Sequence, residues 1–366
     1  MKLVTITIFA LLFLSACIQV EQPVEKIKIG VSQPFTGPAA FIGNWVRTGI
    51  EMAYSELPAE NQSRIEFVFE DDGCTGKKGV DALQKLVSVD KVNFVIGPTC
   101  GNVIVPTIDL MRDSDTIYLT TGVIPELPTG AGDHHFTLQP RIRDLMYALA
   151  EYAYQNGARN LSVFYLDDEF GVESVKHFEK RFTEKSGKIV AKEKYGFADT
   201  DFRTQIAKLK DSPVDGVFIM SYGSWLINQL KQMDELGWKP QIYGPVPVQD
   251  PKLIEAAGKL AENIIYPYPE DREKAQKQIE FEAKYKERFG TVPEIYSTIG
   301  YDSFSALWQA IDKCGTNKVC VKKELAQLNF KGAGGIISLD ADGIGKRNIL
   351  IKQIKNGKFE FAEVEK

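Results

Sequence analysis

Five cysteines carry the most evident chemistry in this 366-residue chain, and they fall into three groups. Cys17 closes a short apolar segment at the N-terminus. Cys74 and Cys100 flank an interval of helical size, and Cys314 and Cys320 lie close together. Nearness along the chain favours the disulfides Cys74–Cys100 and Cys314–Cys320, with buried unpaired thiols as the alternative. We expect no metal site, because no histidine lies at a ligand spacing from a cysteine; the histidines are His134, His135 and His177.

The first residues are typical of an export signal. Lys2 precedes an apolar run that ends at Leu14 and is too short to span a bilayer, and small residues follow before Cys17. Leu-Ser-Ala-Cys resembles the lipobox of prokaryotic lipoproteins, in which the cysteine is acylated and becomes the first mature residue; a plain signal peptide is the alternative. We therefore expect a signal peptide over 1–16, a tether over 17–25, and a lipid-anchored body at the cell surface or in the periplasm, where disulfides persist.

Charge and hydropathy restrict the possible partners. The formal net charge is −5 and the charges are dispersed, so no basic run is available to follow a nucleic-acid backbone. No later apolar segment is long enough to cross a membrane. A mature chain of about 350 residues exceeds what one hydrophobic core usually serves, so we expect two domains.

Residues suited to catalysis are sparse. Asp167, Asp168 and Glu169 form a carboxylate cluster at the end of an expected strand, but adjacent side chains point in different directions and are usually solvated. The sequence contains no glycine loop for a dinucleotide or phosphate, no nucleophile elbow and no HExxH helix. The segment Asp340–Gly343 lacks the later ligands of a calcium loop and predicts a turn. We expect neither an enzyme nor a cofactor.

Strand and helix patterns alternate along the chain, which predicts parallel sheets covered by helices on both faces. The clearest expected strands are 65–70, 93–97, 161–166 and 216–220. Two long amphipathic helices, Asp271–Phe289 and Ser297–Asp312, follow, and the tail predicts strands joined by Asp/Gly turns. The predicted fold class is α/β, with two lobes in series.

Small polar residues follow three expected strands of the first lobe: Thr36–Pro38, Thr99–Asn102 and Thr120–Gly122. Ligands of open α/β sheets bind at this carboxyl edge, and free amides at helix N-termini favour a carboxylate or a similar anion. Phe170 and Tyr222 would face these groups from strand ends of the second lobe. This arrangement predicts a cleft that closes on a small ligand.

At these residues the chain resembles the type I periplasmic solute-binding proteins, specifically the leucine/isoleucine/valine-binding receptors of ABC transporters. The resemblance covers essentially the whole mature chain and rests on motifs that are weak singly but occur in order, among them IKIGVSQPFTGPAAFIG, FEDDGC, FVIGPTC, LTTGVIPEL, DDEFG, YGPVP and FKGAGGIISLDADG. It implies two Rossmann-like lobes with parallel sheets and three crossover hinges, near Gln139–Arg143, Pro267–Glu270 and Gly343–Asn348. Lobe one would comprise 26–140 and 270–345, and lobe two 141–269 and 346–366.

The resemblance also implies the ligand-binding residues. The α-carboxylate of a ligand would be held at Gly101, Asn102, Thr121 and Val123, where Gly101 replaces the serine usual in the family. The apolar and aromatic side chains of the site would be Phe41, Ile42, Phe170 and Tyr222.

Val246 is the main departure from the family pattern. Amino-acid-binding members carry at this position the acid that pairs with the ligand ammonium, and an unpaired buried ammonium is unfavourable. Either another acid substitutes (Asp168, Glu169 or Asp250), or the ligand has no amine. The sequence favours the second alternative, a carboxylate or amide ligand with an apolar body, and predicts weak or absent binding of leucine, isoleucine and valine.

These observations predict an extracytoplasmic solute-binding lipoprotein of an ABC importer that closes over a small amino-acid-like, carboxylate or amide ligand. Its partners would be that ligand, the permease and ATPase subunits, and the membrane that holds the lipid anchor. We expect a monomer. The alternative is a sensory lipoprotein that signals to a membrane partner; permease and ATPase genes beside this one would favour transport.

Overall fold

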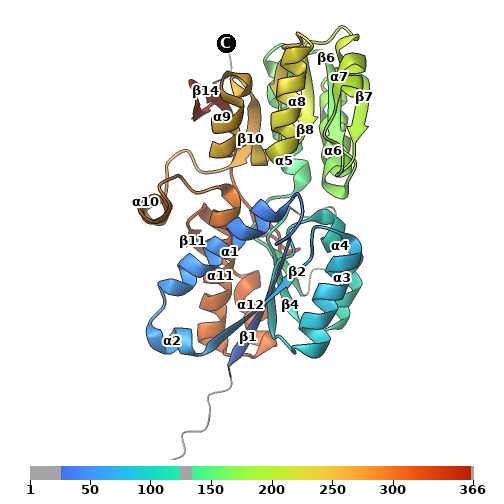
Figure 1. Ribbon diagram of the computed structural model, residues 1–366. Helices are drawn as coiled ribbons and strands as arrows, with labels where there is room; N and C mark the ends of the chain where they lie inside the picture. Colours follow the sequence, from blue (N-terminus) through green and yellow to red (C-terminus); the bar gives the residue numbers. More distant parts are fainter. Residues whose placement is uncertain (1–25, 124–133, 364–366) are drawn as a thin grey trace, which may run out of the picture.

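The computed structural model describes residues 26–123 and 134–363, so Cys17 and the expected signal and tether lie outside the described residues. The described chain forms two α/β lobes placed end to end (Figure 1). This confirms the predicted fold class. None of the described helices is long and apolar enough to cross a membrane.

Lobe one surrounds a five-stranded parallel sheet with the order β2-β1-β3-β4-β5. Its strands are β1 (Ile27–Gln33), β2 (Ile65–Asp71), β3 (Phe94–Ile96), β4 (Ile117–Thr120) and β5 (His135–Thr137). Its helices are α1 (Ala40–Ser55), α2 (Ala59–Ser63), α3 (Gly76–Gln84) with a π-helical turn η1 (Lys85–Val89), α4 (Gly101–Asp113), α10 (Gln276–Phe289), α11 (Ile295–Cys314) and α12 (Lys318–Ala326). A small antiparallel sheet joins this lobe through a bridge between Thr137 and Ile344; its strands are β11 (Asn329–Gly332), β12 (Gly335–Leu339) and β13 (Gly345–Lys346).

Lobe two surrounds a seven-stranded sheet with the order β15-β14-β10-β9-β8-β6-β7. Its strands are β6 (Asn160–Leu166), β7 (Lys188–Tyr195), β8 (Gly216–Met220), β9 (Gln241–Tyr243), β10 (Ile265–Pro269), β14 (Ile349–Lys355) and β15 (Lys358–Phe361). Its helices are α5 (Ile142–Gln155), α6 (Glu169–Glu184), α7 (Arg203–Lys210), α8 (Gly223–Glu235) and α9 (Pro251–Ala257), with 3-10 turns η3 (Val246–Val248) and η4 (Gly258–Ala261).

The sheet of lobe two has an antiparallel edge added to its parallel strands. Strands β6 to β10 are parallel, whereas β14 is antiparallel to β10 and to β15. Asn356 and Gly357 both have positive φ, 53° and 66°, in the two-residue turn between β14 and β15. This turn reverses the chain within two residues and so makes β15 an antiparallel edge strand.

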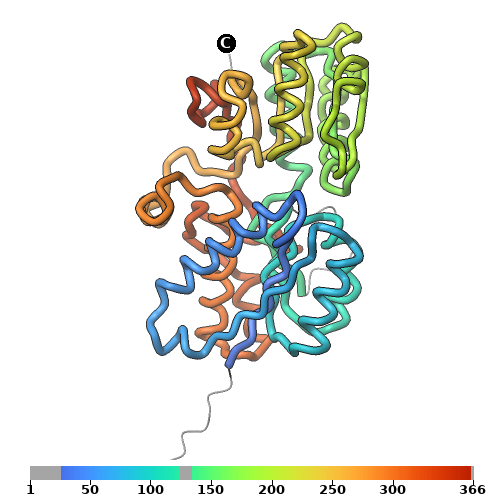
Figure 2. The backbone as a smooth tube through the Cα atoms, in the orientation of Figure 1, coloured from blue at the N-terminus to red at the C-terminus, as the bar shows by residue number. Residues whose placement is uncertain are grey.

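The chain crosses from one lobe to the other after β5, after β10 and after β13 (Figure 2). The lobe boundaries given by the sequence stay a prediction. The first strand of lobe one and the last strand of lobe two lie at opposite ends of the molecule (Figure 1).

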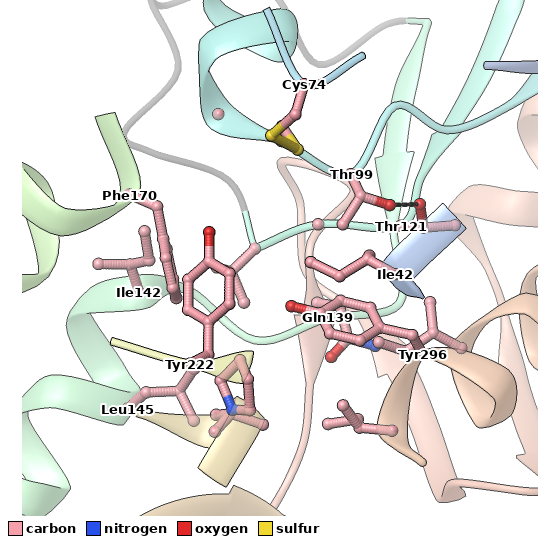
Figure 3. Close-up of a pocket in the computed structure, with 18 of the residues that line it drawn as sticks. Ile42, Cys74, Thr99, Thr121, Gln139, Ile142, Leu145, Phe170, Tyr222 and Tyr296 are labelled. Atoms are coloured by element: carbon pink, nitrogen blue, oxygen red, sulfur yellow. Dashed lines mark hydrogen bonds between the residues drawn. A yellow bond between two sulfur atoms is a disulfide. The ribbon is translucent and has the colours of Figure 1, made fainter. Parts of the chain in front are cut away.

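Close packing of two helices fixes one wall of the space between the lobes. A Cβ on Gly49 of α1 would lie 1.9 Å from the Ser297 carbonyl oxygen, and one on Gly300 of α11 would lie 2.1 Å from the Val46 carbonyl oxygen. Both positions therefore require glycine, and the backbones of α1 and α11 touch. This contact sets Ile42 of α1 beside Tyr296 of α11, and both face the other lobe (Figure 3).

Candidate functional site between the lobes

A pocket between the lobes encloses about 760 Å³ of empty space, counting the part that is open to solvent. Lobe one contributes strand ends and the first turns of helices, and lobe two contributes aromatic and apolar side chains (Figure 3). Most of the predicted ligand residues line this pocket, namely Ile42, Gly101, Thr121, Val123, Phe170, Tyr222 and Val246.

Three buried polar side chains at the strand ends of lobe one form a closed hydrogen-bonded ring. Gln33 Nε2 donates to Thr121 Oγ1 at 2.8 Å, and Thr99 Oγ1 donates to Gln33 Oε1 at 2.6 Å. The two threonine hydroxyls are 2.6 Å apart (Figure 3). Because the Thr99 proton is used on Gln33, Thr121 is the donor in this third bond. Thr121 can therefore turn its hydroxyl proton toward a ligand acceptor at the cost of one bond to Thr99.

The first turn of α4 is the anion-favouring part of the pocket. Cys100, which precedes α4, makes no side-chain cap, and no described residue accepts a bond from the Gly101 or Asn102 amide. Unbonded amides and the helix dipole favour a negative group at this place. The Cys74–Cys100 disulfide, with Cα atoms 5.4 Å apart, ties this turn to the loop after β2.

Both predicted disulfides are present. Cys74 and Cys100 both line the pocket, so their bond forms part of its wall. Cys314 pairs with Cys320, which lies in the first turn of α12. The second disulfide therefore joins the end of α11 to the start of α12.

Aromatic side chains cover the pocket from the side of lobe two. Tyr222 and Phe170 have ring centroids 6.5 Å apart, and Tyr296 points toward them from lobe one (Figure 3). Burial, with the charge of Asp168, raises the pKa of Tyr222 and of Tyr296 above the usual range, so both phenols stay neutral. Neither hydroxyl bonds to another described residue, so both can bond to a ligand.

Two predicted ligand residues, Phe41 and Asn102, lie outside the lining of this pocket, and their role stays a prediction. Phe41 does not line the pocket and instead packs against Tyr222, with ring centroids 6.4 Å apart. The Asn102 side chain also lies outside the lining; its Oδ1 accepts a bond from the Glu169 amide across the cleft at 3.1 Å. Both residues therefore contact the opposite lobe.

Gly101 allows this approach of the lobes. A Cβ at this position would lie 3.2 Å from Glu169 Cβ and 3.6 Å from the Phe170 amide nitrogen. A serine here would press against the first turn of α6. The close contact between the lobes is a physical reason for glycine at a position where the family usually has serine.

Asp168 lines the pocket, and it is one of the three acids that the sequence analysis named as a possible partner of a ligand ammonium. It caps α6, with Oδ1 accepting a bond from the Gly171 amide at 2.7 Å. Burial raises the pKa of Asp168 to about 6, against the opposing effect of the Gly171 amide, and Glu169 and Asp167 add negative charge nearby. Glu169 and Asp250 do not line the pocket.

Several lining residues were not predicted as ligand residues. They are Thr99, Gly122, Gln139, Ile142, Leu145, Met146, Pro247, Ile295, Tyr296 and Ile299. Helices α5 and α11 supply most of them, and only the fold brings these helices to the strand ends. Within residues 26–123 and 134–363, no His, Cys, Asp or Glu side chains gather as they would around a metal ion.

Comparison with known proteins bears on the family and the fold of the chain. The family model described as "Periplasmic binding protein" matches residues 26–358. A leucine-, isoleucine-, valine-, threonine- and alanine-binding protein of Pseudomonas aeruginosa is 24% identical over 344 residues, covering 92% of this chain and 91% of the relative. A Leu/Ile/Val-binding protein homolog of Brucella abortus is 26% identical over 328 residues, covering 87% of each chain.

Solved structures of similar proteins have the same fold. The leucine-binding protein LivK of Thermotoga maritima superposes with a TM-score of 0.84 at 24% identity, covering 92% of this chain and 98% of that one. A solute-binding protein of R. palustris in complex with benzoate gives 0.83 at 19% identity, covering 92% and 95%. The relatives are named as binding proteins, which confirms the expectation that the chain is not an enzyme. The chain belongs to the periplasmic binding protein family.

Proposed function

We propose that this protein is a lipid-anchored solute receptor of an ABC importer that closes its two lobes over a small amino-acid-like, carboxylate or amide ligand. The observation that carries the proposal is the division of the pocket between the lobes. Lobe one presents the α4 amides and Thr121, which suit a carboxylate or amide oxygen. Lobe two presents Phe170 and Tyr222, which suit an apolar body.

Closure follows from this division. A ligand held by both lobes is bound fully only in the closed state, so it shifts the population toward closure. The shape of the closed receptor would then tell the permease that it is loaded. The relatives named for leucine, isoleucine and valine, and the R. palustris structure with benzoate, support a small ligand that carries a carboxylate.

A thermal-shift screen of amino acids, amides, short-chain acids and aromatic acids tests the ligand class. We expect at least one carboxylate or amide to raise the unfolding temperature, and small-angle scattering to show a smaller radius of gyration with that ligand. A panel without any stabilising compound would contradict the proposed pocket chemistry.

The anchor and the transport role need separate tests. If Cys17 is acylated, the wild-type protein should incorporate labelled palmitate and Cys17→Ser should not. If the N-terminus is a plain signal peptide, neither the wild-type protein nor Cys17→Ser should be labelled. Deletion of the gene should reduce uptake of the ligand that the screen finds. Unchanged uptake together with a lost transcriptional response to that ligand would favour the sensory alternative.

A further inference from the structure

Asp168 is the one carboxylate in the pocket lining, and the described lining contains no Lys, Arg or His side chain. Its Oδ1 accepts the Gly171 amide, and no described hydrogen bond or ion pair reaches Oδ2. The charged side chains that act on it are Glu169 and Asp167, which are also acids. The phenols of Tyr222 and Tyr296 are neutral neighbours.

A partly buried carboxylate in such surroundings lacks a positive partner. With a pKa of about 6, Asp168 is still mostly ionised at neutral pH. Burial of a charge without a counter-charge is unfavourable. A positively charged group of the ligand would supply the missing counter-charge and would be attracted to the Asp168 carboxylate. The polar part of the pocket therefore favours an anionic group at the α4 amides and a cationic group at Asp168.

These two places lie close together. A Cβ on Gly101 would be 3.2 Å from Glu169 Cβ, and the Asn102 side chain bonds the Glu169 amide at 3.1 Å. Asp168 directly precedes Glu169. An α-amino acid carries its ammonium and carboxylate on one carbon, so a single compact ligand can reach both the α4 turn and the α6 cap. The apolar wall formed by Ile142 and Leu145 remains for its side chain.

Resting on the function proposed above, we infer that Asp168 binds the ammonium group of an amine-bearing carboxylic acid ligand. Asp168 then takes the role that Val246 has lost, from a different element of the same lobe. This inference replaces the preference for an amine-free ligand, because that preference considered only the position of Val246.

Matched ligand pairs test the inference on the mature protein. Leucine and 4-methylpentanoate share one carbon skeleton with and without the amine, and phenylalanine and 3-phenylpropanoate form a second pair. By titration calorimetry at pH 7.5, we expect the wild-type protein to prefer an amine-bearing member at least tenfold, and Asp168→Asn to reduce this preference below threefold. Asparagine caps helices as well as aspartate does, so the start of α6 is kept.

Asp250→Asn is the matched control. Asp250 also caps a helix, α9, by accepting the Lys252 amide at 2.9 Å, and it lies outside the pocket lining. This variant should leave the preference unchanged.

A change of pH provides a second test. Lowering the pH from 7.5 to 5 protonates Asp168, so binding of the amine-bearing ligand should weaken more in the wild-type protein than in Asp168→Asn. Asp167 and Glu169 are present in both proteins and therefore do not contribute to this difference.

The outcomes separate this inference from the proposed function. Equal or tighter binding of an amine-free acid, or a preference that persists in Asp168→Asn, overturns the role of Asp168 and leaves the receptor function standing. Failure of all four probes, together with an empty thermal-shift screen, contradicts the proposed function itself.

Discussion

Asn102→Ala removes one hydrogen bond that exists only when the lobes meet. Asn102 belongs to α4 of lobe one, and its Oδ1 accepts the amide of Glu169, the first residue of α6 in lobe two, at 3.1 Å. A net intramolecular hydrogen bond of this kind contributes about 0.5–1.5 kcal/mol. In the proposed function the ligand is held in the closed state, so the whole loss would appear in its affinity, which should fall about 2- to 12-fold.

Asn317→Ala provides a control for this measurement. Asn317 Oδ1 accepts the Cys320 amide, also at 3.1 Å, but this bond lies within lobe one at the start of α12. Titration calorimetry should therefore show weaker binding for Asn102→Ala alone, and thermal unfolding without ligand should show a lower midpoint for Asn317→Ala alone. An Asn102→Ala affinity within twofold of wild type, or equal weakening by both variants, would refute the closure role.

Three further predictions concern the pocket, its disulfide and a buried histidine. Tyr222→Ala should weaken ligand binding about 30-fold or more in calorimetry, as expected for a central buried aromatic contact, and an unaltered affinity would count against the site. Replacing Cys74 and Cys100 by serine should lower the free energy of unfolding by roughly 3.5 kcal/mol in urea titrations, because the closed loop restricts the unfolded chain; a change below about 1 kcal/mol would contradict that reasoning. Burial lowers the pKa of His135 to about 4, so the unfolded chain binds a proton before the folded one does, and stability should fall as the pH drops from about 6.5 to 4. His135→Gln should flatten this part of the melting-temperature profile, and parallel profiles for the two proteins would disprove the assignment.

Strands buried on both faces were the easiest elements to predict. The expected strand 216–220 coincides with β8, because a continuous run of apolar residues is stable only when it is buried, and every residue of β8 is buried. β5 was missed since it comprises only His135–Thr137 and follows polar residues. Here the position in the sheet, which the sequence pattern does not contain, decides that the segment is a strand.

β10 was not among the predicted strands, and it contains two prolines. Pro267 and Pro269 lie in this strand, which pairs with β14, and the crossover expected near Pro267–Glu270 stays a prediction. The Ile265 carbonyl accepts a bond from Gly244 on the β9 side, so the nitrogens of alternate residues, Pro267 and Pro269, face that same side. β9 pairs with β10 only at Ile265, and the prolines therefore lose no hydrogen bond.

Most of the residues predicted from strand ends line the pocket, whereas lining residues that only packing brings there were not predicted. Thr121 and Tyr222 follow strands directly, so the general rule for open sheets found them. Tyr296 lies on α11, whose position over α1 is set by the contact of Gly49 and Gly300. No spacing in the sequence predicts the contact between α1 and α11. The sequence also could not show that Asp168, unlike Glu169 and Asp250, lines the pocket.

The described part of the chain begins and ends at opposite poles of the molecule, which has a mechanical consequence. β1 begins at the end of lobe one farthest from the cleft, whereas β15 ends in lobe two (Figure 1). A receptor held by its N-terminus would therefore keep lobe one as the stationary half, and lobe two would swing as the moving half. A fluorophore attached after residue 363 and another near residue 26 would ride on different halves, so the distance between them would follow each closing event directly.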